Sequence, residues 1–592
     1  MSEIGKLSAL LVGIGVLSAP LGAQAANFDT QGFVRFESAL KLNNEENPYN
    51  QQGNLFNGVT VTRDSSAIGG FTDTVTRQNP MGDTDNTFNL FAIRGELDIS
   101  ANFSPNLSGV MHVRGFVDPG IYDDDGSTDF FQTPFFGNRA TRLEVSGDHY
   151  MIDLPSLYLD YVNGPLWIRA GNQQIAWGES LFFRVLDVPN GLDLRRHFIL
   201  DWVAEEYADE RVSSPGVRAS YRVFGDTEVE GFAQMFNPSI LPNPNTPYNL
   251  IAAQFAVHQR DQFDEVKNAW TYGGRVQTKI GDLGLQFIGV SRRNPDGVYR
   301  WVQSGVNRDL PGMPGTGAIL ANTPFEVAPQ DGVMSAQEWF TYSGMARLNG
   351  VTALNSAVTD FEPYTSMLGA FAVGDTDMAL ASQELDLFFQ LSGGLQGHIE
   401  RIYPREEIFG VGANYIFFDE PGSFLDQLVV RAEATFTPNK KFTSPDLRHE
   451  LIEADEVAAS LVFEKYHRFA DTFPATFLAF QYLFKSESDL FGRYLGGNGG
   501  SIDSLPDGAG SFNALVFAVQ QPFPNLVWRA DFSVLADVKG GALIQPGLRW
   551  KPNGEFGVEM YANITLSNGQ NDNIIETIDF ADELGLRVTF QF

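Results

Sequence analysis

The carboxyl-terminal segment 583–592 constrains the fold more than any other part of this sequence. Apolar residues occupy every second position of it: Leu584, Leu586, Val588, Phe590 and Phe592. Because successive side chains on a strand point to opposite faces, the segment has one apolar face and one polar face. A strand that faces lipid on one side and water on the other requires this pattern. The edge strand of a soluble sheet would also show this alternation. The rest of the chain must therefore discriminate between a membrane strand and a soluble one.

The amino terminus predicts export. Lys6 precedes the apolar run 7–16, and the small-residue sequence Ala23-Gln24-Ala25 follows. This is the pattern of a secretory signal peptide covering residues 1–25. The run is shorter than the roughly 20 residues of a membrane-spanning helix, and no later uncharged segment reaches that length. Only a closed barrel could therefore cross a membrane, and a terminal phenylalanine such as Phe592 is usual in bacterial outer-membrane barrels.

Composition excludes several classes of protein. The chain has no cysteine, and 40 basic against 73 acidic residues give a net charge of −33. The charge disfavours nucleic-acid binding, because phosphates need cationic partners. The absence of thiols excludes disulfides and thiolate metal sites. The 49 phenylalanines suit both a lipid-facing wall and an apolar lumen, and a soluble sandwich would need fewer.

Amphipathic strands with short turns repeat along the chain. In segment 556–564, for example, apolar residues alternate with polar ones directly after the turn Pro552-Asn553-Gly554. Short turns alternate with long polar linkers, as in outer-membrane barrels with periplasmic turns and external loops. We therefore predict an all-β, transmembrane antiparallel barrel of about 18 strands (16–18) in the outer membrane, with both termini periplasmic. Residues 26–592 would form this one domain, and a large secreted β-protein is the alternative.

Charged residues recur on the predicted inner face of these strands. The basic ones are Arg94, Arg114, Arg218, Arg222, Arg275, Lys279, Arg431, Arg529, Arg549 and Arg587, and the acidic ones are Glu96, Asp98, Glu230, Glu433 and Asp531. One interpretation is a ladder of ion pairs between neighbouring strands. The other is a field that selects charged solutes, and both can hold together.

The segment 171–196 is the most distinctive stretch of the chain. It contains Gly171, Gln174, Trp177-Gly178-Glu179, Phe182, Pro189, Asn190, Asp193 and Arg195. In this order the residues resemble the hallmark of a proteobacterial outer-membrane barrel family known as domain of unknown function 1302. Members usually have arginine where this chain has Asn172, so an arginine partner for Glu179 is missing there.

The resemblance implies a setting as well as a fold. Family members are similar to outer-membrane channels that are encoded near inner-membrane pumps of the resistance-nodulation-division type and near a periplasmic lipid-binding-like protein. That setting implies movement of hydrophobic compounds such as sterols, long-chain alcohols or lipids. The partners it implies are outer-membrane lipids, those two proteins, and the barrel-assembly machinery that receives the Phe592 strand.

Two long loops are candidates for function, 177–214 and 294–403. In the first, Trp177, Phe182 and Phe183 are expected to form a constriction while Glu179 pairs with Arg195 or Arg196; Arg184 is a further candidate. The alternative is that these residues only pin the loop to the wall. The second is longer than ordinary connections and carries apolar segments at helical spacing, so we expect a plug or lid in the lumen or the outer mouth, or a segment that merely caps or trimerises.

No pattern in the chain predicts catalysis. The seven histidines are scattered, and the acidic run Asp123-Asp124-Asp125 departs from the EF-hand spacing. No metal or cofactor is expected, although a Ser/His pair assembled in space would leave no sequence trace. The sequence therefore predicts a channel or transporter for hydrophobic or amphipathic small molecules. The alternatives are a general porin for hydrophilic solutes and a structural docking partner of a trans-envelope pump.

Overall fold

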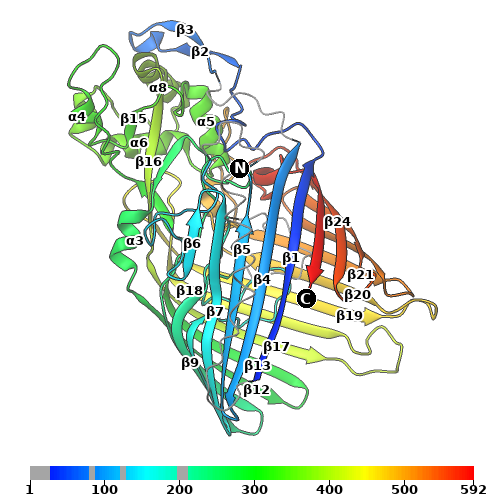
Figure 1. Cartoon of the computed structure of the whole chain (residues 1–592). Helices are drawn as coiled ribbons and strands as arrows, with labels where there is room; N and C mark the ends of the chain where they lie inside the picture. The colour runs from blue at the N-terminus through cyan, green and yellow to red at the C-terminus, as the bar shows by residue number, and fades with distance from the viewer. Residues whose placement is uncertain (1–26, 79–86, 121–127, 196–210) are drawn as a thin grey trace, which may run out of the picture.

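A closed antiparallel β-barrel of 18 strands forms the body of the molecule (Figure 1). The structure is a computed structural model, and it describes residues 27–78, 87–120, 128–195 and 211–592; the predicted signal peptide lies outside these ranges. The wall closes where β1 pairs with β25 on one edge and with β4 on the other. In chain order the wall strands are β1 (Asn27–Lys41), β4 (Phe88–Ser104), β5 (Leu107–Val117), β7 (Tyr150–Asn163), β8 (Leu166–Gln173), β9 (Ser214–Phe224), β10 (Thr227–Met235), β12 (Trp270–Ile280), β13 (Leu283–Arg293), β17 (Arg405–Ile416), β18 (Val429–Phe442), β19 (Ile452–His467), β20 (Thr476–Lys485), β21 (Phe512–Pro522), β22 (Trp528–Asp537), β23 (Gly541–Trp550), β24 (Phe556–Leu566) and β25 (Glu583–Gln591).

The alternation of residues decides which side chains face lipid. Val34 of β1 lies opposite Phe590 of β25, and both side chains are exposed on the outer face. The next pair, Arg35 and Thr589, faces the lumen, where the Arg35 Nε donates to the Thr589 hydroxyl at 3.0 Å. An apolar outer wall with a polar inner wall is the arrangement that an outer-membrane barrel needs. The predicted fold class and outer-membrane location are therefore confirmed.

The two ends of the barrel differ in the length of their connections. Tight turns such as 164–165, 225–226 and 281–282 lie at one end, which is the periplasmic end in barrels of this type. The opposite, outer end carries most of the long loops: 42–87, 118–149, 174–213, 236–269, 294–404, 443–451, 486–511 and 567–582. One periplasmic connection, 417–428, is longer than the other turns at that end, a departure that the sequence pattern did not indicate.

The loop 294–404 folds into a helical cap beyond the outer ends of the strands (Figure 1, green). The stacked rings of Trp301 and Trp339, 6.3 Å apart, lie in its apolar core. Neighbouring loops hold it in place: the Asn349 backbone N–H donates to the Pro445 carbonyl at 2.8 Å, and the Arg347 guanidinium donates to the Asn573 carbonyl at 2.7 Å. Its elements are β14 (Val298–Trp301), α4 (Gly317–Leu320), β15 (Phe325–Val327), α5 (Ala336–Met345), α6 (Gly350–Thr359), α7 (Tyr364–Met367), α8 (Met378–Ser392) and β16 (Leu395–Ile402).

Helix α8 shows why this loop becomes helical rather than extended. The Asp377 carboxylate accepts the Leu380 backbone N–H at 3.0 Å at the amino end, and Gly393 ends the helix with φ of 79°. These are the two capping devices that satisfy the free backbone groups of a helix. Shorter elements lie in other outer loops: β2 (Thr60–Asp64), η2 (Ser66–Ile68), β3 (Thr72–Thr76), β6 (Glu144–Gly147), β11 (Phe255–His258), α3 (Arg260–Val266), η4 (Leu495–Gly497) and η5 (Ile575–Ile578). Within the described residues, no helix has the length and hydropathy to cross a membrane.

Candidate functional site: the loop folded into the lumen

The chain leaves the wall at Gln173 and folds inward before returning to it at Ser214. Trp177 is the first anchor of this inward loop. Its side chain is 1% exposed, its ring lies 5.1 Å from that of Phe232 on β10, and its indole N–H donates to Glu230 at 2.6 Å. Trp177 therefore fixes the start of the loop against the neighbouring part of the wall.

Glu433 of β18 holds the next turn of the loop. Its carboxylate accepts the Ser180 backbone N–H at 3.1 Å, the Ser180 hydroxyl at 2.9 Å and the Leu186 N–H at 3.2 Å. It also accepts the backbone N–H of Glu179. A buried carboxylate surrounded by backbone donors is well compensated, so this turn is tied to the wall at one point by several bonds.

Gln481 of β20 is the third anchor and lies on the opposite side of the ring from β8. Its side-chain oxygen accepts the backbone N–H groups of Leu181 at 3.2 Å, Phe182 at 2.7 Å and Phe183 at 3.3 Å. Its amide N–H in turn donates to the Ser460 hydroxyl at 2.8 Å. The loop thus runs through the lumen from one wall to the other and occupies part of the path through the barrel.

The expected aromatic constriction does not form as a single cluster. Trp177 packs with Ile175, Leu186 and residues of β10, β13 and β17, whereas Phe182 and Phe183 pack against β20 to β23. The prediction that these three rings meet is therefore wrong, because their backbone segments are held by different strands. The arrangement corresponds to a loop pinned to the wall, and gating by this loop stays a prediction.

The predicted pairing of Glu179 with Arg195 is also wrong. The Glu179 carboxylate accepts the Asn414 amide at 3.0 and 2.9 Å and lies 3.5 Å from Arg431 Nε. Arg195 instead forms buried ion pairs with Glu144 at 3.0 Å and with Asp193 at 2.9 Å. Arg196 lies outside the described residues, as does the acidic run 123–125. The other candidate, Arg184, lies 3.5 Å from Asp187.

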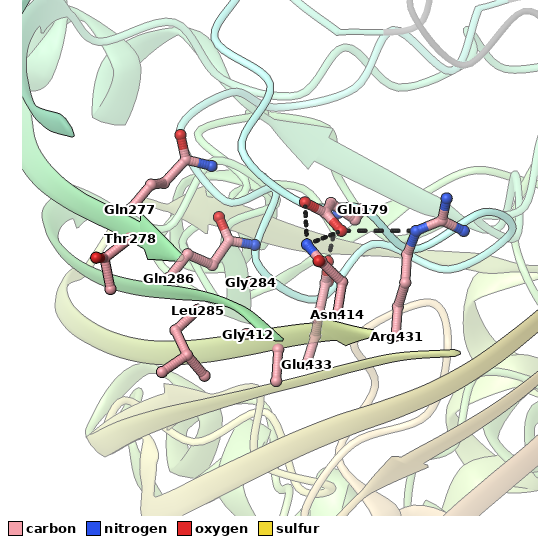
Figure 2. A pocket seen from close by; sticks show the side chains of 11 residues that line it. Glu179, Gln277, Thr278, Gly284, Leu285, Gln286, Gly412, Asn414, Arg431 and Glu433 are labelled. Carbon is pink, nitrogen blue, oxygen red and sulfur yellow. Dashed lines mark hydrogen bonds and ion pairs between the residues drawn. The ribbon is translucent and has the colours of Figure 1, made fainter. Parts of the chain in front are cut away.

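A cavity of about 80 Å³ lies beside Glu179 (Figure 2). Its lining mixes charges and amides: Glu179, Glu433 and Arg431 with Gln277, Gln286 and Asn414, together with Thr278, Gly284, Leu285, Gly412 and Ala413. Arg431 also forms an ion pair with Glu464. The cavity is therefore a polar space bounded by the inward loop and by strands β12, β13, β17 and β18. Within the described ranges, no group of three or more metal-ligating acidic or histidine side chains is positioned to hold a metal ion.

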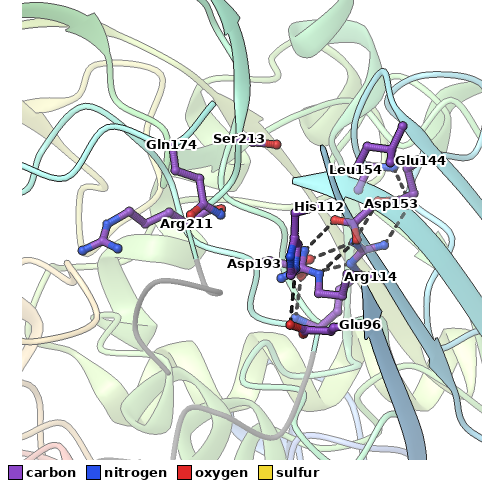
Figure 3. Close-up of polar contacts among 12 residues, drawn as sticks. Glu96, His112, Arg114, Glu144, Asp153, Leu154, Gln174, Asp193, Arg211 and Ser213 are labelled. Atoms are coloured by element: carbon purple, nitrogen blue, oxygen red, sulfur yellow. Dashed lines mark hydrogen bonds and ion pairs between the residues drawn. The ribbon is translucent and has the colours of Figure 1, made fainter. Parts of the chain in front are cut away.

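The predicted arginine ladder consists of ion pairs on the inner wall, most of them between neighbouring strands. The pairs are Arg94–Glu96 at 2.6 Å, Arg114–Asp153 at 2.5 Å, Arg218–Glu230 at 2.6 Å, Arg275–Glu230 at 2.8 Å, Arg431–Glu464, Arg529–Asp531 at 2.8 Å and Arg549–Glu559 at 3.2 Å. Figure 3 shows Arg114 facing Asp153, with His112 near Glu96. Arg222 lies exposed at the periplasmic end of β9. The pairing supports a structural role, and selection of solutes by these charges stays a prediction.

The inner wall has a second, apolar face on β20 to β23. The inward residues Ala479, Leu483, Ala514, Val516, Ala518, Leu535 and Leu543 form a stripe there, and Phe182 and Phe183 cover it. An aqueous pore has a polar interior. The lumen of this barrel instead combines an apolar stripe on β20 to β23 with ion-paired arginines on other strands and, nearer the periplasmic turns, on β22 and β23.

Sequence reasoning placed Glu433 on the inner face but did not identify it or Gln481 as anchors of the loop. One local signal was present for Gln481, since it is the polar residue between the inward apolar positions Ala479 and Leu483. A polar side chain in such a place needs a buried partner. The partner itself lies about 300 positions away in the chain, and no local pattern identifies it.

These features together define a porin-like outer-membrane β-barrel with an in-folded loop. The model of the family described as "Protein of unknown function (DUF1302)" matches residues 6–592, so the chain belongs to this family. The resemblance seen in segment 171–196 is thereby confirmed. A comparison with curated proteins gives no match.

Solved structures of outer-membrane proteins are similar to this chain at low identity. OccAB2 of Acinetobacter baumannii has 7% identity and a TM-score of 0.43, with 96% of this chain and 98% of that chain covered. OccAB3 of the same organism has 8% identity and a TM-score of 0.41, covering 96% and 99%. Pseudomonas aeruginosa OccK2 (OpdF) in complex with glucuronate has 7% identity and a TM-score of 0.39, covering 96% and 98%. The strand pairing of the chain itself defines the barrel independently of these neighbours.

Proposed function

We propose that this protein is an outer-membrane channel that passes small amphipathic or hydrophobic molecules, lipid- or sterol-like in character, without covalent chemistry. The two-faced lumen carries this proposal. An apolar stripe on β20 to β23 would receive the apolar part of such a molecule, while the ion-paired arginines opposite would face its polar group. A purely hydrophilic solute gains nothing from Leu, Val and Phe side chains along its path.

The inward loop would act as the gate. Phe182 and Phe183 now cover the apolar stripe, so cargo and loop would compete for the same surface. Movement of the segment 179–186 needs the bonds to Glu433 and Gln481 to break, while Trp177 could stay in place as the hinge end. We propose the helical cap as a second barrier at the outer mouth.

A general porin for hydrophilic solutes is the second candidate. The polar cavity beside Glu179 favours it, since carboxylates, amides and a guanidinium can bind hydroxyl-rich solutes. Docking to a periplasmic lipid-binding-like protein and an inner-membrane pump is a further proposal, and so is recognition of the Phe592 strand by the barrel-assembly machinery.

Reconstitution in liposomes separates the two candidates. We expect slow swelling in small sugars and measurable uptake of a fluorescent long-chain alcohol by the wild-type protein. Replacing 179–186 by a Gly-Ser linker should raise sugar entry, because this part of the loop is then no longer held across the lumen. Deletion of 294–403 tests the cap in the same assay. Rapid sugar entry by the wild-type protein, with no uptake of the alcohol, would show that the porin candidate is correct.

A further inference from the structure

A buried arginine of the helical cap has no acidic partner. Arg347 follows α5, and its side chain is 4% exposed. Its Nη2 donates to the Asn573 carbonyl at 2.7 Å, whereas its Nε and Nη1 are buried without a hydrogen-bond acceptor. Among the residues that the structure describes, no carboxylate forms an ion pair with this guanidinium, and Asp489 and Asp572 act on it only at longer range. A buried cation is costly unless a charge compensates it, so Arg347 is a candidate for binding an anion.

A second guanidinium acts on the first, that of Arg493 in the loop 486–511. Burial, and next the positive charge of Arg493, lower the pKa of Arg347 to about 10, well below its usual value. Arg493 Nε donates to Asp489 at 2.7 Å, so this acid is already engaged. Its Nη2 donates to the Thr577 hydroxyl at 3.0 Å. Two like charges repel each other, and an anion held by both would relieve that repulsion.

Tyr49 brings a hydroxyl to the same place from the loop 42–87. Its side chain is 3% exposed, its hydroxyl is hydrogen-bonded to Thr577, and both guanidiniums act on it electrostatically. A tyrosine hydroxyl that accepts one hydrogen bond can still donate its own proton to another group. We call Arg347, Arg493, Tyr49 and Thr577 the arginine cluster. Four segments far apart in the sequence thus bring their polar groups to one place under the cap.

The arginine cluster lies at the outer end of the apolar stripe. Asn573, whose carbonyl accepts the Arg347 guanidinium, is directly followed by Ile574. Ile574 belongs to the same apolar cluster as Leu535 and Leu543, which lie at the outer ends of β22 and β23. An apolar surface therefore begins beside the cations and continues down the inner wall. Such a surface matches a molecule whose anionic head is joined to an apolar chain, because adjoining groups would receive both parts.

We propose that the arginine cluster binds the anionic head of an amphipathic molecule, a carboxylate or a group of similar size, whose chain lies on the apolar stripe. Arg347 and Arg493 would supply the positive charge, and the Tyr49 hydroxyl would donate a further hydrogen bond. Guanidinium groups bind carboxylates through charge-assisted hydrogen bonds, which are stronger than neutral ones. This inference rests on the proposed function, since the chain needs the apolar stripe. It adds the charge of the cargo and the place where its head is held.

Binding of a fluorescent fatty acid tests the charge of the head. The probes are cis-parinaric acid and the corresponding alcohol, which share one chain, added to the detergent-solubilised protein at about pH 9, where the acid is ionised. The wild-type protein should bind the acid at least about tenfold more tightly than the alcohol, because hydrogen bonds between charged groups are the stronger kind. Arg347→Met should reduce the affinity for the acid to that for the alcohol and leave the alcohol unaffected. Equal affinities in the wild-type protein would overturn the inference and leave the proposed function standing, whereas binding of neither probe would reject both.

Two further variants control for the loss of an arginine. Arg308→Met removes an exposed arginine of the same cap that also donates to a backbone carbonyl, that of Val327, and it should bind both probes as the wild-type protein does. Arg347→Lys keeps the charge and should retain part of the preference for the acid. Heat-modifiable gel mobility verifies that each variant is folded. If Arg308→Met loses the preference as fully as Arg347→Met, general charge attracts the acid and the inference fails.

Hydrogen exchange of the wild-type protein locates the head without any variant. At about ten times its Kd, the acid should slow the exchange of segments 345–349 and 571–577 by about tenfold, and the alcohol should not. An acid that binds without slowing either segment would contradict the arginine cluster as the site. Acetate is the anion without a chain. If acetate at the same concentration slows exchange as much as the acid does, the anion site stands and the amphipathic cargo of the proposed function is rejected.

Discussion

The side-chain oxygen of Gln481 accepts the backbone N–H of Phe182 at 2.7 Å, joining the inward loop to the wall opposite the strand that carries it. Gln481 is fully buried, and the same oxygen also receives the N–H groups of Leu181 and Phe183. One side chain therefore holds three consecutive backbone N–H groups of the loop on the far wall.

Gln481→Leu should release the loop from β20. Each buried N–H that loses its acceptor costs about 1–3 kcal/mol, so the loop should leave the wall while the barrel stays folded. We expect larger conductance in planar bilayers and faster sugar entry into liposomes. Gln545→Leu is the matched control, because Gln545 is a buried wall glutamine of β23 that bonds to Ser533 and Asn563. Unchanged conductance in Gln481→Leu would show that the loop holds its position without this anchor.

Trp177→Ala should destabilise the start of the loop by about 3–5 kcal/mol, the usual cost of removing a large buried aromatic side chain. It also leaves Glu230 without its indole donor. Trp177→Phe should cost less, since a ring still packs on Phe232 while the hydrogen bond to Glu230 and part of the buried ring volume are lost. Thermal unfolding followed by circular dichroism measures both variants. If Trp177→Phe destabilises the protein as much as Trp177→Ala, the hydrogen bond to Glu230 alone anchors the loop.

Arg114→Ala should strongly weaken the wall, by about 3–5 kcal/mol, because it leaves the buried carboxylate of Asp153 without its ion pair. The double variant Arg114→Met with Asp153→Leu should recover most of that loss, since no buried charge remains. Arg549→Ala is the control: its side chain is 28% exposed, and exposed pairs contribute about 0–1 kcal/mol. Urea unfolding monitored by gel mobility compares the three. If Arg114→Ala and Arg549→Ala lower the free energy of unfolding equally, the expectation that buried ion pairs stabilise the wall more than exposed ones is contradicted.

The helical cap should lose stability as the pH rises. Burial raises the pKa of Glu384 on α8 from 4.5 to about 7, although its side chain accepts the Phe371 backbone N–H at 2.8 Å. The folded cap thus favours the protonated acid. That contribution to stability is fully present below the unfolded pKa of 4.5 and is lost as the pH rises through about 7.

Glu384→Gln should remove this dependence, because the amide keeps an acceptor and cannot ionise. Hydrogen exchange of the segment 371–385 between about pH 5 and about pH 8, corrected for intrinsic exchange, measures it. Glu362→Gln serves as the control, since Glu362 is an exposed acid of the same cap. A wild-type protein whose corrected protection does not change with pH would refute the expectation.

Local periodicity was sufficient to predict the wall. The inner-face positions of Arg114, Arg218 and Arg275 follow from alternation alone, and their ion pairs follow because partners on neighbouring strands are close. The same reasoning predicted the terminal strand correctly, where Val34 and Phe590 share the outer face.

The contacts of the inward loop could not be predicted in this way. Arg195 is near Glu179 in sequence, but the chain turns back between them, so Arg195 meets Glu144 while Glu179 meets Asn414. The choice of partner depends on how far the loop reaches across the lumen, which is a property of the closed barrel. Asn172 shows the same limit, since its amide joins Leu154 to Ser213 rather than replacing a partner of Glu179.

The pairing of β1 with β25 has a consequence for the order in which the protein is made. Arg35 and Thr589 are 554 positions apart in the sequence. One edge of β1 therefore stays unpaired until β25, the last wall strand, is available. Contacts this remote form late and slowly. During that interval the exported chain has an unpaired strand edge in an aqueous compartment. Such an edge can pair with the strands of other chains. A truncated copy that ends before β25 would never leave this vulnerable stage, and quality-control proteases would be expected to remove it.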